Sequence, residues 1–203
     1  MATAWRVAVA LMAMLTAGGC GGVATRASRS ETTAASAPRS PTSTAAGASS
    51  TAAGSTLAGL RLTSPAFPPG GAIPSRYTCD GADSVLPVRW SGVPSSVREL
   101  VLVMRDPDAP TANFVHWAVA GIRPGVAGIG AGPLPPGAVQ GRNSFGTLGY
   151  RGPCPPRGGR PHQYVLTLSA LSSSSMLKTG FSADQLRTAA VALGTLIGSY
   201  GRR

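Results

Sequence analysis

The chain has 203 residues, with 18 Lys and Arg against 7 Asp and Glu, which gives a formal net charge of +11. Hydrophobic residues make up 43% and charged residues only 12%. This composition excludes a long coiled coil, which needs sustained heptads of Ala, Glu, Lys, Leu and Arg. Because only one apolar run is found, near the N-terminus, a multi-span membrane protein is excluded. Three cysteines are too few for a disulfide-dense mini-protein.

The positive charge comes almost entirely from arginine, since Lys178 is the only lysine. A basic excess can indicate nucleic acid, anionic lipid or acidic ligands. The arginines are scattered, however, and the longest run is Arg202-Arg203. This scatter favours a codon-usage bias as the origin of the arginine excess. Because zinc-finger spacing and a basic helix are both absent from the sequence, we expect no nucleic-acid partner.

Residues 1–19 are typical of a lipoprotein signal peptide. Trp5-Arg6 provides a short positive segment, and residues 7–15 are apolar but too short to span a bilayer. Ala17-Gly-Gly-Cys20 resembles a bacterial lipobox, with Ala17 where Leu is usual. We therefore expect an exported protein that lipidated Cys20 anchors to the extracytoplasmic side of the cell envelope. Ordinary cleavage that leaves Cys20 free is the alternative, and an uncleaved anchor is a weaker one.

Residues 20–56 are expected to form a disordered tether. Of the 36 residues that follow Cys20, 31 are Gly, Ala, Ser, Thr or Pro. Such a segment buries too little apolar surface to offset its ordering entropy. It would hold a domain away from the surface to which Cys20 is attached.

Residues 57–203 are expected to form one mainly β domain. Short segments with strand character at 60–64, 100–104, 114–122 and 163–171 are separated by Pro- and Gly-rich turns, which predicts a β-sandwich or barrel. Period-two alternation in the third run places two sets of side chains on opposite faces. One set is Phe114, His116, Ala118 and Ala120, and the other is Val115, Trp117 and Val119.

A C-terminal helix is also predicted. Ser182 and Gln185 have the spacing of a capping box. Apolar residues then recur at helical spacing, and Gly198 or Gly201 would end the helix. These apolar residues are Leu186, Ala189, Ala190, Leu193 and Ile197.

Three segments carry candidate chemistry. Asp106-Pro-Asp-Ala-Pro110 follows a buried run, and its two prolines stiffen the loop that holds the Asp106 carboxylate. His116 lies on the next strand, six positions after Pro110, where a hairpin would bring it near Asp106. A rigid segment, residues 149–164, leads into a strand that begins with His162. The ordinary structural alternatives are an acidic surface turn for Asp106 and a core histidine bonded to a backbone carbonyl for His116.

Together these motifs resemble the phosphatidylethanolamine-binding protein family, and in particular its bacterial Raf-kinase-inhibitor-like branch. The matching pieces lie in the family's order and span nearly the whole domain. They are Ile73–Gly81, Trp90–Pro94, Asp106–Pro110, His116-Trp117, Gly149–Tyr164 and Ser169–Leu171. The resemblance implies two packed antiparallel sheets with helices at the C-terminal side.

The resemblance also implies a small pocket for anionic groups such as phosphate-bearing head groups. Its lining would be Asp106, His116, Gly152, Pro156, His162 and Tyr164. Because a carboxylate repels an anion, we expect Asp106 to accept an N–H from a histidine and to orient the other ring nitrogen as a donor. The backbone around Gly152 and Gly158 would offer N–H groups to the anion.

The sequence departs from the family pattern at two places. The loop from Thr111 to Phe114 is short, so only Phe114 could replace aromatic contacts that animal members carry there. The expected C-terminal helix has no histidine where some bacterial relatives have one. Both departures concern which ligand is bound.

Cys79 and Cys154 lie in two of the matching motifs. If Cys20 is lipidated, they remain as an even pair in an oxidising compartment, and we expect a disulfide between them. Two buried free thiols are the alternative.

These observations favour a non-enzymatic binding protein that needs no metal or cofactor. Its partners would be an anionic small molecule or a phospholipid head group, with the membrane reached through Cys20. A hydrolase that uses Asp106, His116 and His162 as acid–base groups or metal ligands is the second hypothesis. A protein-interaction or inhibitor module is the third, and no motif in the sequence identifies its protein partner.

Overall fold

The computed structural model describes residues 59–203, except for residues 112, 187 and 188. The expected signal peptide, the tether and Cys20 lie outside the described residues. In the described part, no helix has the length and hydrophobicity needed to cross a membrane.

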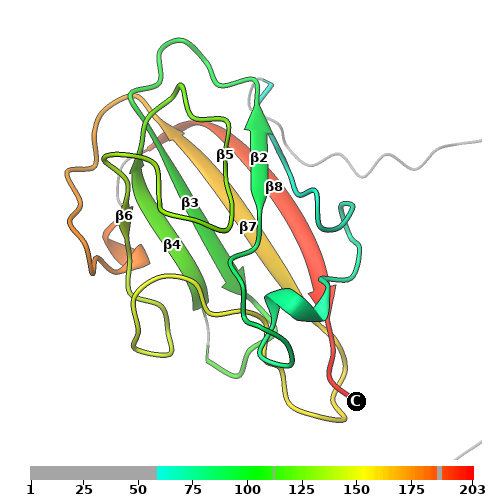
Figure 1. The fold of residues 1–203 in the computed structure, drawn as a ribbon. Coiled ribbons are helices and arrows are strands. Elements are labelled where there is room, and N and C mark those ends of the chain that lie inside the picture. Colours follow the sequence, from blue (N-terminus) through cyan, green and yellow to red (C-terminus); the bar gives the residue numbers. More distant parts are fainter. Residues whose placement is uncertain (1–58, 112, 187–188) are drawn as a thin grey trace, which may run out of the picture. The chain divides into compact units, whose positions relative to one another are not determined.

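Two antiparallel sheets form the domain (Figure 1). The smaller sheet has the order β1 (Arg61–Thr63), β2 (Val88–Ser91) and β5 (Gly128–Ile129). The larger sheet has the order β6-β4-β3-β7-β8. Its strands are β6 (Val139–Gln140), β4 (Phe114–Ile122), β3 (Glu99–Asp106), β7 (His162–Leu171) and β8 (Ala190–Tyr200). Short 3-10 turns lie at η1 (Ser75–Tyr77) and η2 (Ala183–Gln185).

The main core lies between the two sheets. Leu62 of β1 and Trp90 of β2 pack in one cluster with Leu102 of β3, Trp117 of β4 and Leu168 of β7, and all five side chains are buried. Along β2 and β7 every second residue points inward, as expected for a sandwich with period-two alternation. The predicted mainly β, antiparallel sandwich is confirmed.

The outer face of the larger sheet is partly covered by the segment before β8. Val101 and Val103 of β3 are buried there against Phe181 and Ala183. This second cluster makes β3 buried on both faces, which explains why residues 100–104 are continuously apolar.

The predicted C-terminal helix is wrong. The Ser182–Gln185 capping box is present, but it caps only η2, and residues 190–200 form β8, paired with β7 over its whole length. Three of the residues that β8 buries, Ala192, Leu196 and Gly198, are spaced for a strand. Gly198 also disfavours a helix, since glycine costs about 1 kcal/mol relative to alanine there. Pairing with β7 therefore outweighs the helical spacing of the apolar residues.

The predicted alternation along β4 is interrupted by a bulge at His116. Trp117 pairs with Met104 and Val115 pairs with Arg105, so His116 is the extra residue. As a result Val115 lies in the outer cluster with Ala118, and not with Trp117 in the main core. Bulges re-aim side chains at the edges of sites. This one directs His116 towards the loop of residues 149–160.

Candidate functional site

A cavity of about 320 Å³ lies at one end of the larger sheet. It is formed where β3 ends, β4 begins and the loop before β7 returns. The described residues that line it are Asp106, Ala109, Pro110, Thr111, Phe114, His116, Phe145, Cys154, Pro155, Pro156, His162 and Arg202. Two other hollows of about 340 and 320 Å³ lie near β5 and η2, but neither histidine lines them. The cavity thus unites all three candidate segments.

Asp106 and His162 form a buried pair at the base of this cavity. Oδ2 of Asp106 accepts a hydrogen bond from Nδ1 of His162 at 2.8 Å, and the two residues are 4% and 8% exposed. Oδ1 of Asp106 accepts from the backbone N–H of Asp108 at 2.9 Å. Both carboxylate oxygens are therefore engaged inside the protein, and the His162 ring is fixed by its Nδ1.

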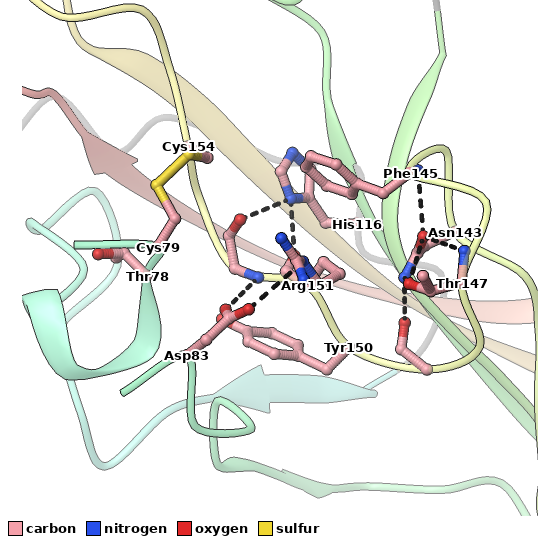
Figure 2. A network of polar contacts seen from close by, with 12 residues as sticks. Thr78, Cys79, Asp83, His116, Asn143, Phe145, Thr147, Tyr150, Arg151 and Cys154 are labelled. Carbon is pink, nitrogen blue, oxygen red and sulfur yellow. Dashed lines mark hydrogen bonds and ion pairs between the residues drawn. A yellow bond between two sulfur atoms is a disulfide. The ribbon is translucent and has the colours of Figure 1, made fainter. Parts of the chain in front are cut away.

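His116 is fixed by backbone carbonyls in place of a carboxylate. Its Nδ1 lies 2.8 Å from the carbonyl oxygen of Arg151 and 3.1 Å from that of Gly152 (Figure 2). The ring is 2% exposed, and its edge contacts Tyr164 with 5.2 Å between ring centroids. Burial holds the pKa of His116 below its usual value, although the carbonyls and Asp106 oppose this shift.

Gly152 lies behind the cavity, and the expected backbone anion nest is not formed. Its N–H donates to Oδ1 of Asp83 at 2.7 Å, and the N–H of Gly158 donates to the Arg202 carbonyl at 3.0 Å. A Cβ at Gly152 would collide with the Tyr77 carbonyl oxygen and lie 2.7 Å from Asp83 Oδ1. Glycine is required here for close packing of the loop that holds His116.

Tyr164 also lies behind the lining. It is fully buried, and its hydroxyl has no hydrogen-bond partner among the described residues. Burial raises the pKa of Tyr164, and the nearby Asp106 carboxylate adds to the shift. The phenol therefore stays protonated.

A disulfide joins Cys79 to Cys154 at the cavity wall, which confirms the bond expected for this pair of cysteines. The S–S distance is 2.07 Å and the Cα atoms are 5.4 Å apart. The backbone N–H of Cys79 also donates to the Pro153 carbonyl at 3.1 Å. These links attach the segment after η1 to the loop that carries Gly152 and Pro156.

Two arginines close in sequence or space to the cavity residues, Arg202 and Arg160, are each paired with an aspartate. Arg202 donates from Nε and Nη2 to Asp80 at 2.8–3.0 Å, and this bonding, with that of Tyr200, lowers the pKa of Asp80. Arg160 lies 2.8 Å from Asp108. Of these arginines, Arg202 itself lines the cavity, where its Nη1 lies 3.5 Å from the Pro155 carbonyl.

The described residues do not form a recognisable metal centre. No group of three or more His, Cys, Asp or Glu side chains in the described segments is placed to hold a metal ion. With Nδ1 engaged on both rings, the two histidines could offer only their Nε2 atoms.

Comparison with known proteins gives a consistent family assignment. Residues 63–200 match the family model of phosphatidylethanolamine-binding proteins. The chain belongs to this family. A UPF0098 protein of Methanothermobacter thermautotrophicus is 43% identical over 152 residues, which cover 70% of this chain and 99% of that protein. LppC of Mycobacterium tuberculosis, whose name proposes a lipoprotein, is 39% identical over 145 residues, or 70% and 72% of the two chains.

Solved structures of the family share the fold. The phosphatidylethanolamine-binding protein homolog CT736 of Chlamydia trachomatis is 33% identical, with a TM-score of 0.66 over 71% of this chain and 98% of that one. YbcL of Escherichia coli, described as a member of the mammalian family, is 28% identical, with the same TM-score over 71% and 99%. The resemblance stated from the motifs is therefore confirmed.

Phe145 is a lining residue that the motifs did not reveal. Its ring lies edge-on to Phe114, with centroids 5.0 Å apart, and 5.4 Å from His116. Asn143 holds its turn, because the Asn143 Oδ1 accepts the backbone N–H groups of Phe145 and Thr147 at 3.0 and 3.1 Å (Figure 2). This phenylalanine supplies an aromatic contact at the mouth that Phe114 alone was expected to make.

Proposed function

We propose that this protein is a non-enzymatic binding protein whose cavity takes a small phosphate-bearing anion. One observation carries the proposal: both imidazoles in the cavity have Nδ1 bonded to internal acceptors, and their Nε2 atoms remain for a ligand. Protonated His162 would donate from Nε2, and its charge would be balanced by Asp106. The apolar rings of Phe114 and Phe145 would exclude water from one side of the ligand.

Asp106 could orient His162 as a general base, but the cavity lining has few groups that could act in hydrolysis. Thr111 is the one hydroxyl-bearing residue among its described lining residues, and it is exposed. Asp106 has no free oxygen for proton transfer, because both accept internal hydrogen bonds. We therefore favour binding over catalysis.

A calorimetric titration tests the binding proposal. Inorganic phosphate and phosphoethanolamine are titrated into the purified protein, into His162→Ala and into the control Lys178→Ala. Lys178 is exposed and lies outside the cavity lining. We expect saturable binding that is lost in His162→Ala and kept in Lys178→Ala. Equal binding by all three proteins, or by none, would contradict the proposal.

We further propose that the domain is held at the cell envelope through lipidated Cys20. The lipobox-like sequence and the Ala-, Ser- and Thr-rich segment after it support this, as does the name of the mycobacterial relative LppC. Multiple acyl chains give stable anchoring where a single chain does not. A fatty-acid label should enter the expressed protein and be absent from Cys20→Ser. Equal labelling of both proteins would contradict the anchor.

A further inference from the structure

The hydrogen bonds of His116 determine where its proton lies. Carbonyl oxygens only accept, so an Nδ1 atom at 2.8 and 3.1 Å from two of them must carry the hydrogen. Burial favours the neutral ring by lowering the pKa of His116. In a neutral imidazole with Nδ1–H, the other nitrogen has a lone pair. His116 Nε2 is therefore an acceptor, whereas the donor role expected in the sequence analysis belongs to the histidine that bonds to Asp106, which is His162.

This acceptor belongs to the cavity. No hydrogen bond to Nε2 of His116 is formed within the described part of the chain, and this atom is not among the buried polar atoms that lack a partner. Phe114, Phe145 and Tyr164 pack around the ring at centroid distances of 5.2–5.4 Å and fix its orientation. The lone pair is thus held in place at the cavity wall.

The charged and titratable groups around His116 leave this arrangement intact. The Asp106 carboxylate is engaged by His162 and Asp108, and Arg151 lies 3.4 Å from Asp83. Tyr164 remains a protonated phenol, because burial raises its pKa. The charged and titratable groups nearby are Asp106 on β3, His162 and Tyr164 on β7, Asp83 and Arg151 in loops, and Arg202 after β8, which lines the same cavity and is paired with Asp80.

Building on the proposed function, we propose that His116 makes the cavity selective for oxyanions that carry a hydrogen. One P–OH group of a singly protonated phosphate would donate to His116 Nε2, while its other oxygens accept from His162. Inorganic phosphate and phosphate monoesters have such a form. Sulfate and phosphate diesters have none near neutral pH, and would set an oxygen lone pair against the His116 lone pair. A site that leaves a buried polar group unpaired rejects such a ligand strongly.

A comparison of four ligands tests this selectivity without any variant. Inorganic phosphate, sulfate, phosphoethanolamine and glycerophosphoethanolamine are titrated calorimetrically into the purified protein at constant ionic strength. We expect phosphate to bind at least about tenfold more tightly than sulfate, and the monoester at least about tenfold more tightly than the diester. Equal affinities within either pair would overturn the selectivity and leave the proposed anion site standing. If none of the four binds, the proposed function fails as well.

The pH dependence provides a second readout. The second pKa of a phosphate monoester is about 6, so its singly protonated form decreases as the pH rises. Between pH 5.5 and 8 the affinity for phosphoethanolamine should fall more steeply than that for sulfate. Effects of pH on the protein that act equally on both anions cancel in the ratio of the two affinities. A ratio that does not change with pH would contradict the proposal.

The variant His116→Phe removes the acceptor and keeps a ring in the aromatic cluster. The preference for phosphate over sulfate should fall to within about threefold in this variant, and Lys178→Ala should keep it. Circular dichroism checks that the variant folds, and where it does not, the four-ligand comparison decides. A folded variant that retains the full preference would overturn the role of His116.

Discussion

Asp106 and Gly152 shape the cavity through hydrogen bonds inside the protein. Asp106 makes these bonds with its side chain and Gly152 with its backbone. Asp106 uses one carboxylate oxygen for His162 and the other for the backbone of Asp108. Gly152 gives its N–H to Asp83 and its carbonyl to His116. A residue of this kind determines where an imidazole points, and its replacement should change ligand binding through that imidazole.

Substitution of Gly152 should destabilise the protein. A Cβ there would meet the Tyr77 carbonyl and two further atoms at 2.7–2.8 Å, one on Asp83 and one on Thr78. Gly152→Ala is expected to lower the free energy of unfolding by about 1–3 kcal/mol or more, as overpacking does. Gly159→Ala is the matched control, because its nearest neighbour is the Pro156 carbonyl at 3.5 Å. Denaturant unfolding measures both, and equal stability of the two variants would contradict the packing argument.

Among single residues, the sequence identified those cavity-lining residues that lie within compact motifs. It missed Phe145, which reaches the cavity through tertiary packing. Asp106, His116, Pro156 and His162 lie at strand ends or in rigid loops, and the structure brings all four to one cavity. Phe145 enters through a separate turn that Asn143 organises. The acceptor role of His116 Nε2 could not be predicted, because it depends on which carbonyls face Nδ1 of this ring in the fold.

Among the elements, β8 shows how long-range pairing can outweigh local spacing. Its apolar residues satisfy a helical pattern on one set of positions and a strand pattern on another. The β7 partner, which is distant in sequence, selects the strand. The bulge in β4 is a similar case, since strict alternation along residues 114–122 conceals the register shift at His116. Neither feature could be read from local sequence.

The Gly198 position distinguishes the two interpretations of residues 190–200. In a helix, Gly198→Ala would stabilise the protein by about 1 kcal/mol. In β8, the added Cβ would lie 2.6 Å from Phe67 and 2.7 Å from Ile73, so we expect destabilisation by about 1–3 kcal/mol. Gly125→Ala, where no atom lies within 4 Å, is the control. Thermal unfolding reports the sign, and a stabilised Gly198→Ala protein would refute the strand.

Glu99 connects three elements at the far end of β3 and should make stability depend on pH. Burial opposes ionisation of Glu99, but hydrogen bonds from Ser175, Gly121 and Ser174 outweigh it, so the pKa of Glu99 lies below its usual 4.5. The stabilisation from a lowered pKa is complete above about pH 4.5 and is lost as the pH falls through the folded value.

Removal of the Glu99 charge should therefore flatten the acid side of the stability profile. Glu99→Gln is expected to lower the free energy of unfolding at pH 7 by about 1–3 kcal/mol, because it weakens hydrogen bonds to a buried carboxylate. The difference from wild type should shrink below pH 4. Urea unfolding at several pH values measures this. A difference that stays constant from pH 7 to pH 3 would show that ionised Glu99 contributes nothing.

For the whole molecule, the disulfide is the covalent link between two distant parts of the chain. Cys79 and Cys154 are 75 residues apart, and closing so long a loop restricts the unfolded state. The paired variant Cys79→Ser with Cys154→Ser is expected to lose about 2–5 kcal/mol of stability. Denaturant unfolding with and without reductant checks this. Unchanged stability, or two alkylatable thiols in the unreduced denatured protein, would contradict the link.

The fold class could be predicted for the whole domain because its signals are spread along the chain. Strand-like runs separated by turns indicated a sandwich or barrel, and motifs in the family's order indicated two packed antiparallel sheets. The net charge of +11 was less informative, since Arg202 in the cavity lining is paired with Asp80. The charge of this arginine is therefore offset by pairing with a residue that is distant in the sequence, which composition does not reveal.

The two histidines of the chain allow the central claim to be measured directly. Long-range ¹H–¹⁵N correlation spectra of the imidazoles report the tautomer of each ring and the effect of added phosphate. We predict an Nδ1–H tautomer for His116 at neutral pH, and saturable shifts of both Nε2 resonances when phosphate is added. An Nε2–H tautomer for His116 would contradict the acceptor role. Phosphate that leaves both rings unshifted would contradict the cavity as an anion site.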